Sequence, residues 1–150
     1  MEQRGTEARR QNELSGQVIG ACIEVHRHLG PGLLESAYEH CLAQELALRG
    51  FRTRRQIPIP VRYKGIDLDC GYRLDLVVED QLVLEVKAVE HLLPVHEAQV
   101  ITYLKLTQLP VGLLVNFHVS VLRQGLRRLF GPSPESSVPS CLPVLPSGPR

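Results

Sequence analysis

Several residue types and patterns are scarce in this chain of 150 residues, and each absence argues against a class of protein. The chain has no tryptophan and only 5% aromatic residues, so the base-stacking platforms of single-strand-binding proteins are not obvious in it. No apolar run approaches the roughly 18 residues that a membrane-spanning helix requires. The polar N-terminus lacks the apolar stretch of a secretory signal, and we therefore expect a cytoplasmic protein without a membrane partner.

The net charge of the chain is small, and its cysteines form no paired motif. A formal net charge of +1 is far below that of a protein that coats nucleic acid, so any nucleic-acid contact must come from a local site. The cysteines are widely spaced and include no CxxC pair, which predicts reduced thiols rather than disulfides or zinc ligands. These four residues are Cys22, Cys41, Cys70 and Cys141.

Composition divides the chain into three parts. Residues 1–13 show no apolar periodicity and are predicted to be a flexible N-terminus. Residues 14–130 carry the alternating and helical patterns of one folded domain. Residues 131–150 hold six of the eleven prolines together with five serines, and we expect a disordered tail there because such a segment cannot pack regularly.

Apolar periodicity within the domain predicts an α/β fold with a mixed sheet of four to five strands flanked by helices. Three helices are expected: one from Leu14 to the Gly30-Pro31-Gly32 break, one between that break and Gly50, and one over 95–106. Strands are expected at 57–61, 72–78, 82–89, 111–117 and 119–122, the last followed by a basic turn or helix as far as Phe130.

The strongest chemical signal lies in the segment YRLDLVVEDQLVLEVKAV, which reads as a β-hairpin. With a three-residue turn, Val78 pairs with Leu82, and the same register sets Asp75 opposite Glu85. Because strand side chains alternate with period two, Asp75, Glu85 and Lys87 are predicted to emerge on one face. The opposite face is then apolar and pairs Leu74 with Val86 and Leu76 with Leu84.

Two acids facing each other across a strand pair repel, and a divalent cation would turn that repulsion into binding. Hard oxygen ligands favour Mg²⁺ or Mn²⁺, and Lys87 beside them could orient or deprotonate a water or stabilise charge on a phosphate. The alternative is a solvated hairpin face in which Asp75, Glu85 and Lys87 form ordinary salt bridges. The apolar strand LVLEVKAV favours the first interpretation, because charged groups inside such strands are usually paired with something.

This hairpin resembles the PD-(D/E)XK nuclease superfamily, in which an acid on one strand and an E-x-K on the next form the metal site. Asp75 and Glu85-Val86-Lys87 match that pattern, although Leu74 stands where the family often has proline. The resemblance implies a restriction-endonuclease-like core. A helical Q-x-x-x-Y follows in the branch similar to RecB, here Gln99 to Tyr103, which would either bind the phosphate backbone or brace the site.

More closely, the chain is similar to a group named for a GxxExxY motif, which reads here Gly32-Leu33-Leu34-Glu35-Ser36-Ala37-Tyr38. By that resemblance Glu35 would be a third metal-proximal acid, whereas at a helix N-terminus it could equally serve as a dipole-stabilising carboxylate. Tyr38 would either touch substrate or pack in the core.

The sequence therefore predicts an Mg²⁺-dependent nuclease in which Asp75 and Glu85 bind metal and Lys87 assists the attacking water. Nucleic acid is the expected partner, with DNA favoured over RNA, and a homodimer or an accessory protein remains open. The alternative is a non-catalytic module that binds nucleic acid or protein and keeps only the nuclease fold. The presence of Asp75, Glu85 and Lys87 together favours the enzyme.

Overall fold

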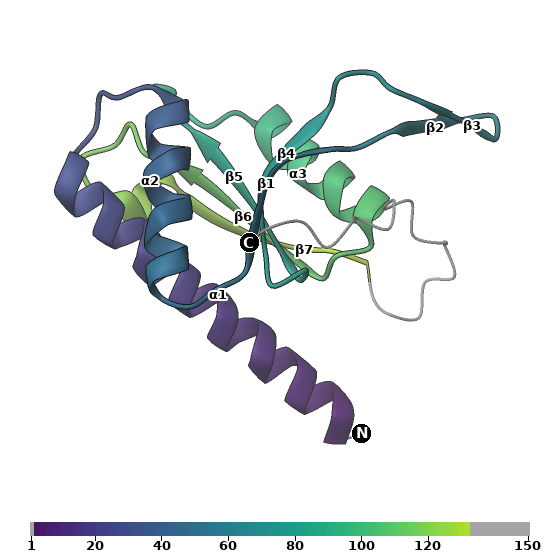
Figure 1. The fold of residues 1–150 in the computed structure, drawn as a ribbon, viewed down its shortest axis with the longest axis horizontal. Helices are drawn as coiled ribbons and strands as arrows, with labels where there is room; N and C mark the ends of the chain where they lie inside the picture. The colour runs from purple at the N-terminus through teal and green to yellow at the C-terminus, as the bar shows by residue number, and fades with distance from the viewer. Residues whose placement is uncertain (1, 133–150) are drawn as a thin grey trace.

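The computed structural model describes residues 2–132 (Figure 1), so the tail predicted for 131–150 lies almost entirely outside the described residues. Its helices are α1 (Glu2–Leu29), α2 (Glu35–Leu48), α3 (Pro94–Thr107) and the short 3-10 helix η1 (Leu122–Gly125). Its strands are β1 (Thr53–Pro58), β2 (Val61–Tyr63), β3 (Ile66–Leu68), β4 (Arg73–Val78), β5 (Leu82–Lys87), β6 (Val111–Asn116) and β7 (Leu126–Phe130).

Five of the strands form one mixed sheet in the order β1-β4-β5-β6-β7. Strands β5 and β6 run parallel, since α3 provides the crossover between them, and the other neighbours are antiparallel. Helices α1 and α2 cover one face of the sheet and α3 covers the other (Figure 1). The predicted α/β architecture, a mixed sheet between helices, is confirmed.

Two apolar clusters hold these layers together, one on each face of the sheet. The first joins α1 and α2 to the sheet through fully buried side chains that include Val18, Leu42, Leu84 and Leu113. The second packs α3 against the opposite face through Val100, Leu104, Val83 and Leu114. Strand β6 is buried along its whole length, as expected of a central strand covered on both faces.

Helix α1 begins at Glu2, which corrects the prediction that this helix starts at Leu14. The segment before Leu14 is rich in Glu, Gln and Arg and has no proline, so the helix can extend at little cost once its core-facing part has formed. Leu14 marks the start of burial instead of the start of the helix. In the part of the chain that the structure describes, no helix combines the length and apolar character needed to cross a bilayer.

The final strand also differs from its prediction. Residues 119–122 are not a strand; Val119 and Leu122 contribute to the first core cluster from a loop and from η1. The strand lies later, at β7, where it pairs antiparallel with β6. Val119 and Leu122 thus reach the core without a strand ladder, whereas Val121 between them is 53% exposed.

The segment predicted as one edge strand over 57–61 is divided. Ile57 lies near the end of the sheet strand β1, whereas Val61 begins a separate two-stranded ribbon made of β2 and β3. This ribbon, called the arm below, extends away from the sheet (Figure 1). It exposes large apolar side chains, with Tyr63 and Ile66 each about three-fifths accessible.

Candidate functional site

The hairpin of β4 and β5 has the register that its sequence predicts. Val78 pairs with Leu82 across a three-residue loop in which Glu79 and Asp80 adopt left-handed backbone angles. Backbone pairing continues to Leu76 and Leu84 and ends there. The next residues in each strand, Asp75 and Glu85, occupy the point where the ladder stops.

Beyond that point the two acids replace the missing ladder bonds with crossed side-chain bonds. The backbone N–H of Asp75 donates to Oε1 of Glu85 (3.2 Å), and the N–H of Val86 donates to Oδ2 of Asp75 (2.9 Å). Each carboxylate is thus held by the opposite strand. The structure brings the two predicted acids together and fixes their orientation through rigid backbone groups.

Burial makes this pair electrostatically unusual. Glu85 is only 3% exposed, and burial together with the negative charge of Asp75 raises the pKa of Glu85 to about 8. The pKa of Asp75 is also raised, first by burial and then by the charge of Glu39, against the lowering effect of the Val86 N–H. Because neighbouring positive charge does not fully compensate two ionised carboxylates here, the pair retains a proton near neutral pH.

Lys87 is the cation nearest to this pair, and it is half-buried at the end of β5. Its charge lowers the pKa of both Asp75 and Glu85. Its backbone is fixed by β6, where Phe117 N–H donates to the Lys87 carbonyl (2.9 Å). Within residues 2–132 the ion pairs of 4.0 Å or less do not include Lys87, so its ammonium group is not locked in a closed salt bridge.

The chain immediately after Lys87 is held by Asn116, which is buried at the end of β6. The Asn116 side chain accepts from Val89 N–H (3.0 Å) and donates to the Val89 carbonyl (2.8 Å). Its oxygen also accepts from His118 N–H at 3.2 Å. This bridge was not foreseen from the sequence, where a single asparagine after an apolar run gives no distinctive signal.

Helix α3 contributes Gln99 and Tyr103 to the same region. The side chain of Gln99, one turn before Tyr103 at i, i+4 spacing, has a lowering effect on the pKa of the Tyr103 hydroxyl. Burial raises the pKa of Tyr103 to about 12, and the charges of Glu85 and Asp75 add to that rise. Tyr103 therefore lies near the acid pair, and it is only 5% exposed.

Helix α2 supplies an acid, but not the one that the sequence predicted. Glu35 lies exposed in the first turn of α2, whereas Glu39, one turn later, is 6% exposed and close enough to raise the pKa of Asp75. Glu39 accepts hydrogen bonds from Arg55 (3.0 Å) and Gln56 (2.5 Å). The two glutamates lie on the same helical stripe, so spacing alone could not decide which of them lies over the acids.

Tyr38 is a core residue and offers no surface to a substrate. Its ring is fully buried and stacks on Phe117 with 4.5 Å between centroids. Its hydroxyl donates to the Gly30 carbonyl (2.5 Å) and accepts from Leu33 N–H (3.1 Å). Tyr38 therefore fixes the connection between α1 and α2, which also contains Gly32 with a φ of +102° that disfavours other residues.

The predicted apolar face of the hairpin needs one correction. Leu76 and Val86 pack in the cluster beneath α1 and α2, but Leu74 packs with Ile57 in the cluster beneath α3. The neighbouring strand is distorted at this level, since Gln56 of β1 has a φ of +52°. The alternation of side chains therefore slips at Asp75, which feels the charge of Glu39 on α2 and itself raises the pKa of Tyr103 on α3.

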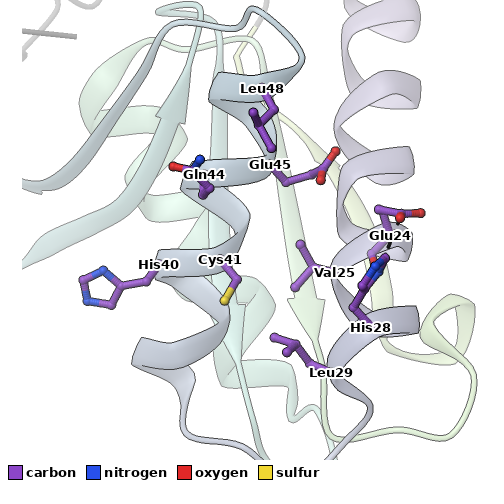
Figure 2. A pocket seen from close by; sticks show the side chains of 9 residues that line it. All are labelled: Glu24, Val25, His28, Leu29, His40, Cys41, Gln44, Glu45 and Leu48. Carbon is purple, nitrogen blue, oxygen red and sulfur yellow. Dashed lines mark hydrogen bonds and ion pairs between the residues drawn. The ribbon is translucent and has the colours of Figure 1, made fainter.

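Two hollows lie near these elements, and Asp75 and Glu85 line neither of them. An open groove of about 850 Å³ follows α3 and is lined by Gln99 and Tyr103 among others. The other, of about 320 Å³, lies between α1 and α2; Figure 2 shows Glu24 and His28 of α1 and Cys41 of α2 among its walls. Only the groove along α3, of these two, is lined by a residue whose pKa responds to the charges of Glu85 and Asp75, namely Tyr103.

Comparison with known proteins gives one informative result. Residues 12–129 match the family model described as the PD-(D/E)XK nuclease superfamily. Comparisons with curated proteins and with solved structures gave no match. The matched range contains the hairpin, α2 and α3, and therefore every residue of the acid pair and its surroundings.

Proposed function

Because the chain belongs to the PD-(D/E)XK nuclease superfamily, we propose that it hydrolyses phosphodiester bonds in nucleic acid with a divalent cation held by Asp75 and Glu85. The observation that carries the proposal is the crossed arrangement of these acids, each bonded to the opposite strand and each with a raised pKa. Buried acids with perturbed pKa values, placed beside a lysine that no closed salt bridge holds, are typical of catalytic sites.

The donor set fits Mg²⁺ or Mn²⁺. Within residues 2–132 no three His, Cys, Asp or Glu side chains are grouped so that they could hold a metal by themselves. Mg²⁺, however, is commonly bound through one or two carboxylates and keeps several waters, so a pair of acids is a sufficient protein contribution. When bound, such an ion would supply charge neutralisation at the phosphate and a more acidic water.

The protein groups have separable tasks in this proposal. Lys87 stabilises negative charge on the phosphate or orients the attacking water, since its charge is felt by both acids. The N–H of Val86 keeps the Asp75 carboxylate in place at 2.9 Å. Gln99 and Tyr103 brace the site from α3, and Glu39 adds negative charge from α2.

We further propose that the chain belongs to the GxxExxY branch and that DNA is favoured over RNA as substrate. The branch motif has a physical basis in the α1–α2 connection, since Gly32 adopts a left-handed backbone and the Tyr38 hydroxyl bonds across the loop. The motif glutamate is then exposed, and Glu39 replaces it as the acid near the metal site.

Calorimetric titration of Mn²⁺ tests the metal site without a choice of substrate. Wild type should bind the ion, Asp75→Asn and Glu85→Gln should lose most of the heat, and the exposed Glu35→Gln should behave as wild type. Equal binding by Asp75→Asn and wild type would remove the acid pair from the proposal.

Cleavage is tested with plasmid, linear duplex and single-stranded substrates in Mn²⁺ or EDTA. Cleavage should require the cation and should fall by about 100-fold or more in Lys87→Ala, the range for loss of a positioned catalytic group. Lys87→Ala should still bind Mn²⁺, which separates loss of chemistry from loss of the metal. Cleavage that is unchanged in Lys87→Ala would contradict the role given to the lysine.

A further inference from the structure

The groove along α3 runs from Val61, at the start of the arm, to Tyr103, whose pKa responds to the charges of the acid pair. One wall of the groove is formed by Val61, at the start of the arm, and by Tyr72, just before β4. The other wall is formed by α3, with Val95, Gln99 and Tyr103. Tyr103 belongs both to the groove, which it lines, and to the surroundings of the acid pair, because the charges of Glu85 and Asp75 raise its pKa. A substrate bound at the acids would therefore continue into this groove.

The walls of the groove are suited to a flat, weakly polar group rather than to phosphate. None of the ten residues that line it in the described part of the chain is lysine or arginine. Phosphate contacts normally use those cations, and charge-assisted bonds to them dominate affinity for a nucleic-acid backbone. The groove instead offers apolar side chains together with the amide of Gln99 and the imidazole of His96.

Aromatic residues are few in this chain, yet two of the four tyrosines meet in the groove. The rings of Tyr72 and Tyr103 lie edge to face, 6.3 Å apart with an interplanar angle of 66°. Tyr103 is nearly buried, whereas Tyr72 is 45% exposed and so has ring surface available to a ligand. Stacking on aromatic rings accepts any base, because every base has a π-face.

We propose that this groove binds an unpaired nucleobase stacked on Tyr72, so that the nuclease acts on single-stranded or frayed nucleic acid. A base inside a duplex is covered by its neighbours and its partner and could not enter without being extruded. The assignment rests on the proposed function for the acids, but it concerns binding and can be tested without cleavage.

The test uses fluorescence anisotropy of labelled oligonucleotides of one sequence, as single-stranded DNA, single-stranded RNA and blunt duplex DNA, in EDTA. Wild type should bind at least one single strand about tenfold or more tightly than the duplex. Tyr72→Ala and Tyr72→Leu should weaken single-strand binding by about tenfold, the loss expected for one base–aromatic stack, and Tyr72→Phe should retain it. The two single strands decide between DNA and RNA.

Tyr63 provides the matched control, since it is an exposed tyrosine on the same arm that does not line the groove. Tyr63→Ala should bind as wild type. Because the chain has no tryptophan, tyrosine emission can be followed directly, and single-strand binding should quench wild type more than Tyr72→Phe. Circular dichroism of each variant confirms that the fold is kept.

Duplex binding as tight as single-strand binding, or Tyr72 variants that bind like wild type, would overturn the groove assignment even if metal-dependent cleavage is found. Conversely, single-strand binding that depends on Tyr72 supports the assignment even if cleavage is absent. Failure of the cleavage assay with intact binding would then count against the hydrolytic proposal alone.

Discussion

Replacement of Glu85 by glutamine should make the protein more stable in alkaline solution. Glu85 is 3% exposed and its pKa is raised from 4.5 to about 8, so the folded state holds its proton while the unfolded chain releases it. A proton held more tightly by the folded state makes unfolding easier as pH rises between these two values. A glutamine amide resembles the protonated acid in shape but has no proton to release in this pH range.

The size of the effect on stability follows from the size of the Glu85 pKa shift. One pKa unit corresponds to ~1.4 kcal/mol, and between pH 5 and pH 8 the Glu85 carboxyl should remove on the order of 3 kcal/mol from the free energy of unfolding. Glu85→Gln should therefore match wild type near pH 5 and exceed it by about that amount at pH 8. The amide introduced by Glu85→Gln can still accept from the Asp75 N–H and donate to the Asp75 carboxylate.

Urea unfolding in EDTA at several pH values measures this difference, and comparison of the two proteins cancels the titrating groups that do not interact with Glu85. Glu90→Gln, an exposed change five residues further along, serves as the control and should follow wild type at each pH. Addition of Mn²⁺ at pH 8, at a hundred times its dissociation constant, should raise the free energy of unfolding of wild type by about 2.7 kcal/mol. The same addition should not stabilise Glu85→Gln. Parallel pH profiles for wild type and Glu85→Gln would refute the reasoning.

Three further predictions concern other parts of the molecule. Tyr38→Phe should lower the free energy of unfolding by about 1–3 kcal/mol, because it removes a donor to Gly30 and leaves the Leu33 N–H without its acceptor, while Mn²⁺ binding measured by calorimetry stays unchanged. Gly125→Ala should destabilise by about 1–3 kcal/mol in urea unfolding, since a Cβ there would lie 2.3 Å from the backbone oxygen of Asn116; stability equal to wild type would contradict that packing. Gly16→Ala should instead stabilise by about 0.5–1 kcal/mol, because this exposed position in α1 has open space around a Cβ, and a loss of thermal stability would count against it.

The hairpin register could be predicted from sequence because a period-two pattern and a short turn leave few alternatives. Val78 opposite Leu82 then places Asp75 and Glu85 together, and the helical spacing of Gln99 and Tyr103 is equally local. Such inferences depend only on backbone geometry that the sequence itself constrains.

Other features depend on how elements dock, and the sequence does not contain that information in a local form. Glu35 and Glu39 share a helical stripe, and only the position of α2 over the sheet brings Glu39 toward Asp75. Leu74 changes face because the adjacent strand is distorted at Gln56, a residue that is not unusual in sequence. The pairing of Tyr72 with Tyr103 likewise joins distant segments of the chain and arises only when the segment before β4 docks beside α3.

The crossed hydrogen bonds of the hairpin have a practical consequence. The amide protons of Asp75 and Val86 point at the side chains of Glu85 and Asp75 rather than at carbonyl groups. In an ¹⁵N-labelled sample these two resonances would act as internal indicators, each reporting the ionisation of one particular carboxyl as acid, base or cation is added. The order in which the two acids lose their protons could then be followed residue by residue in solution.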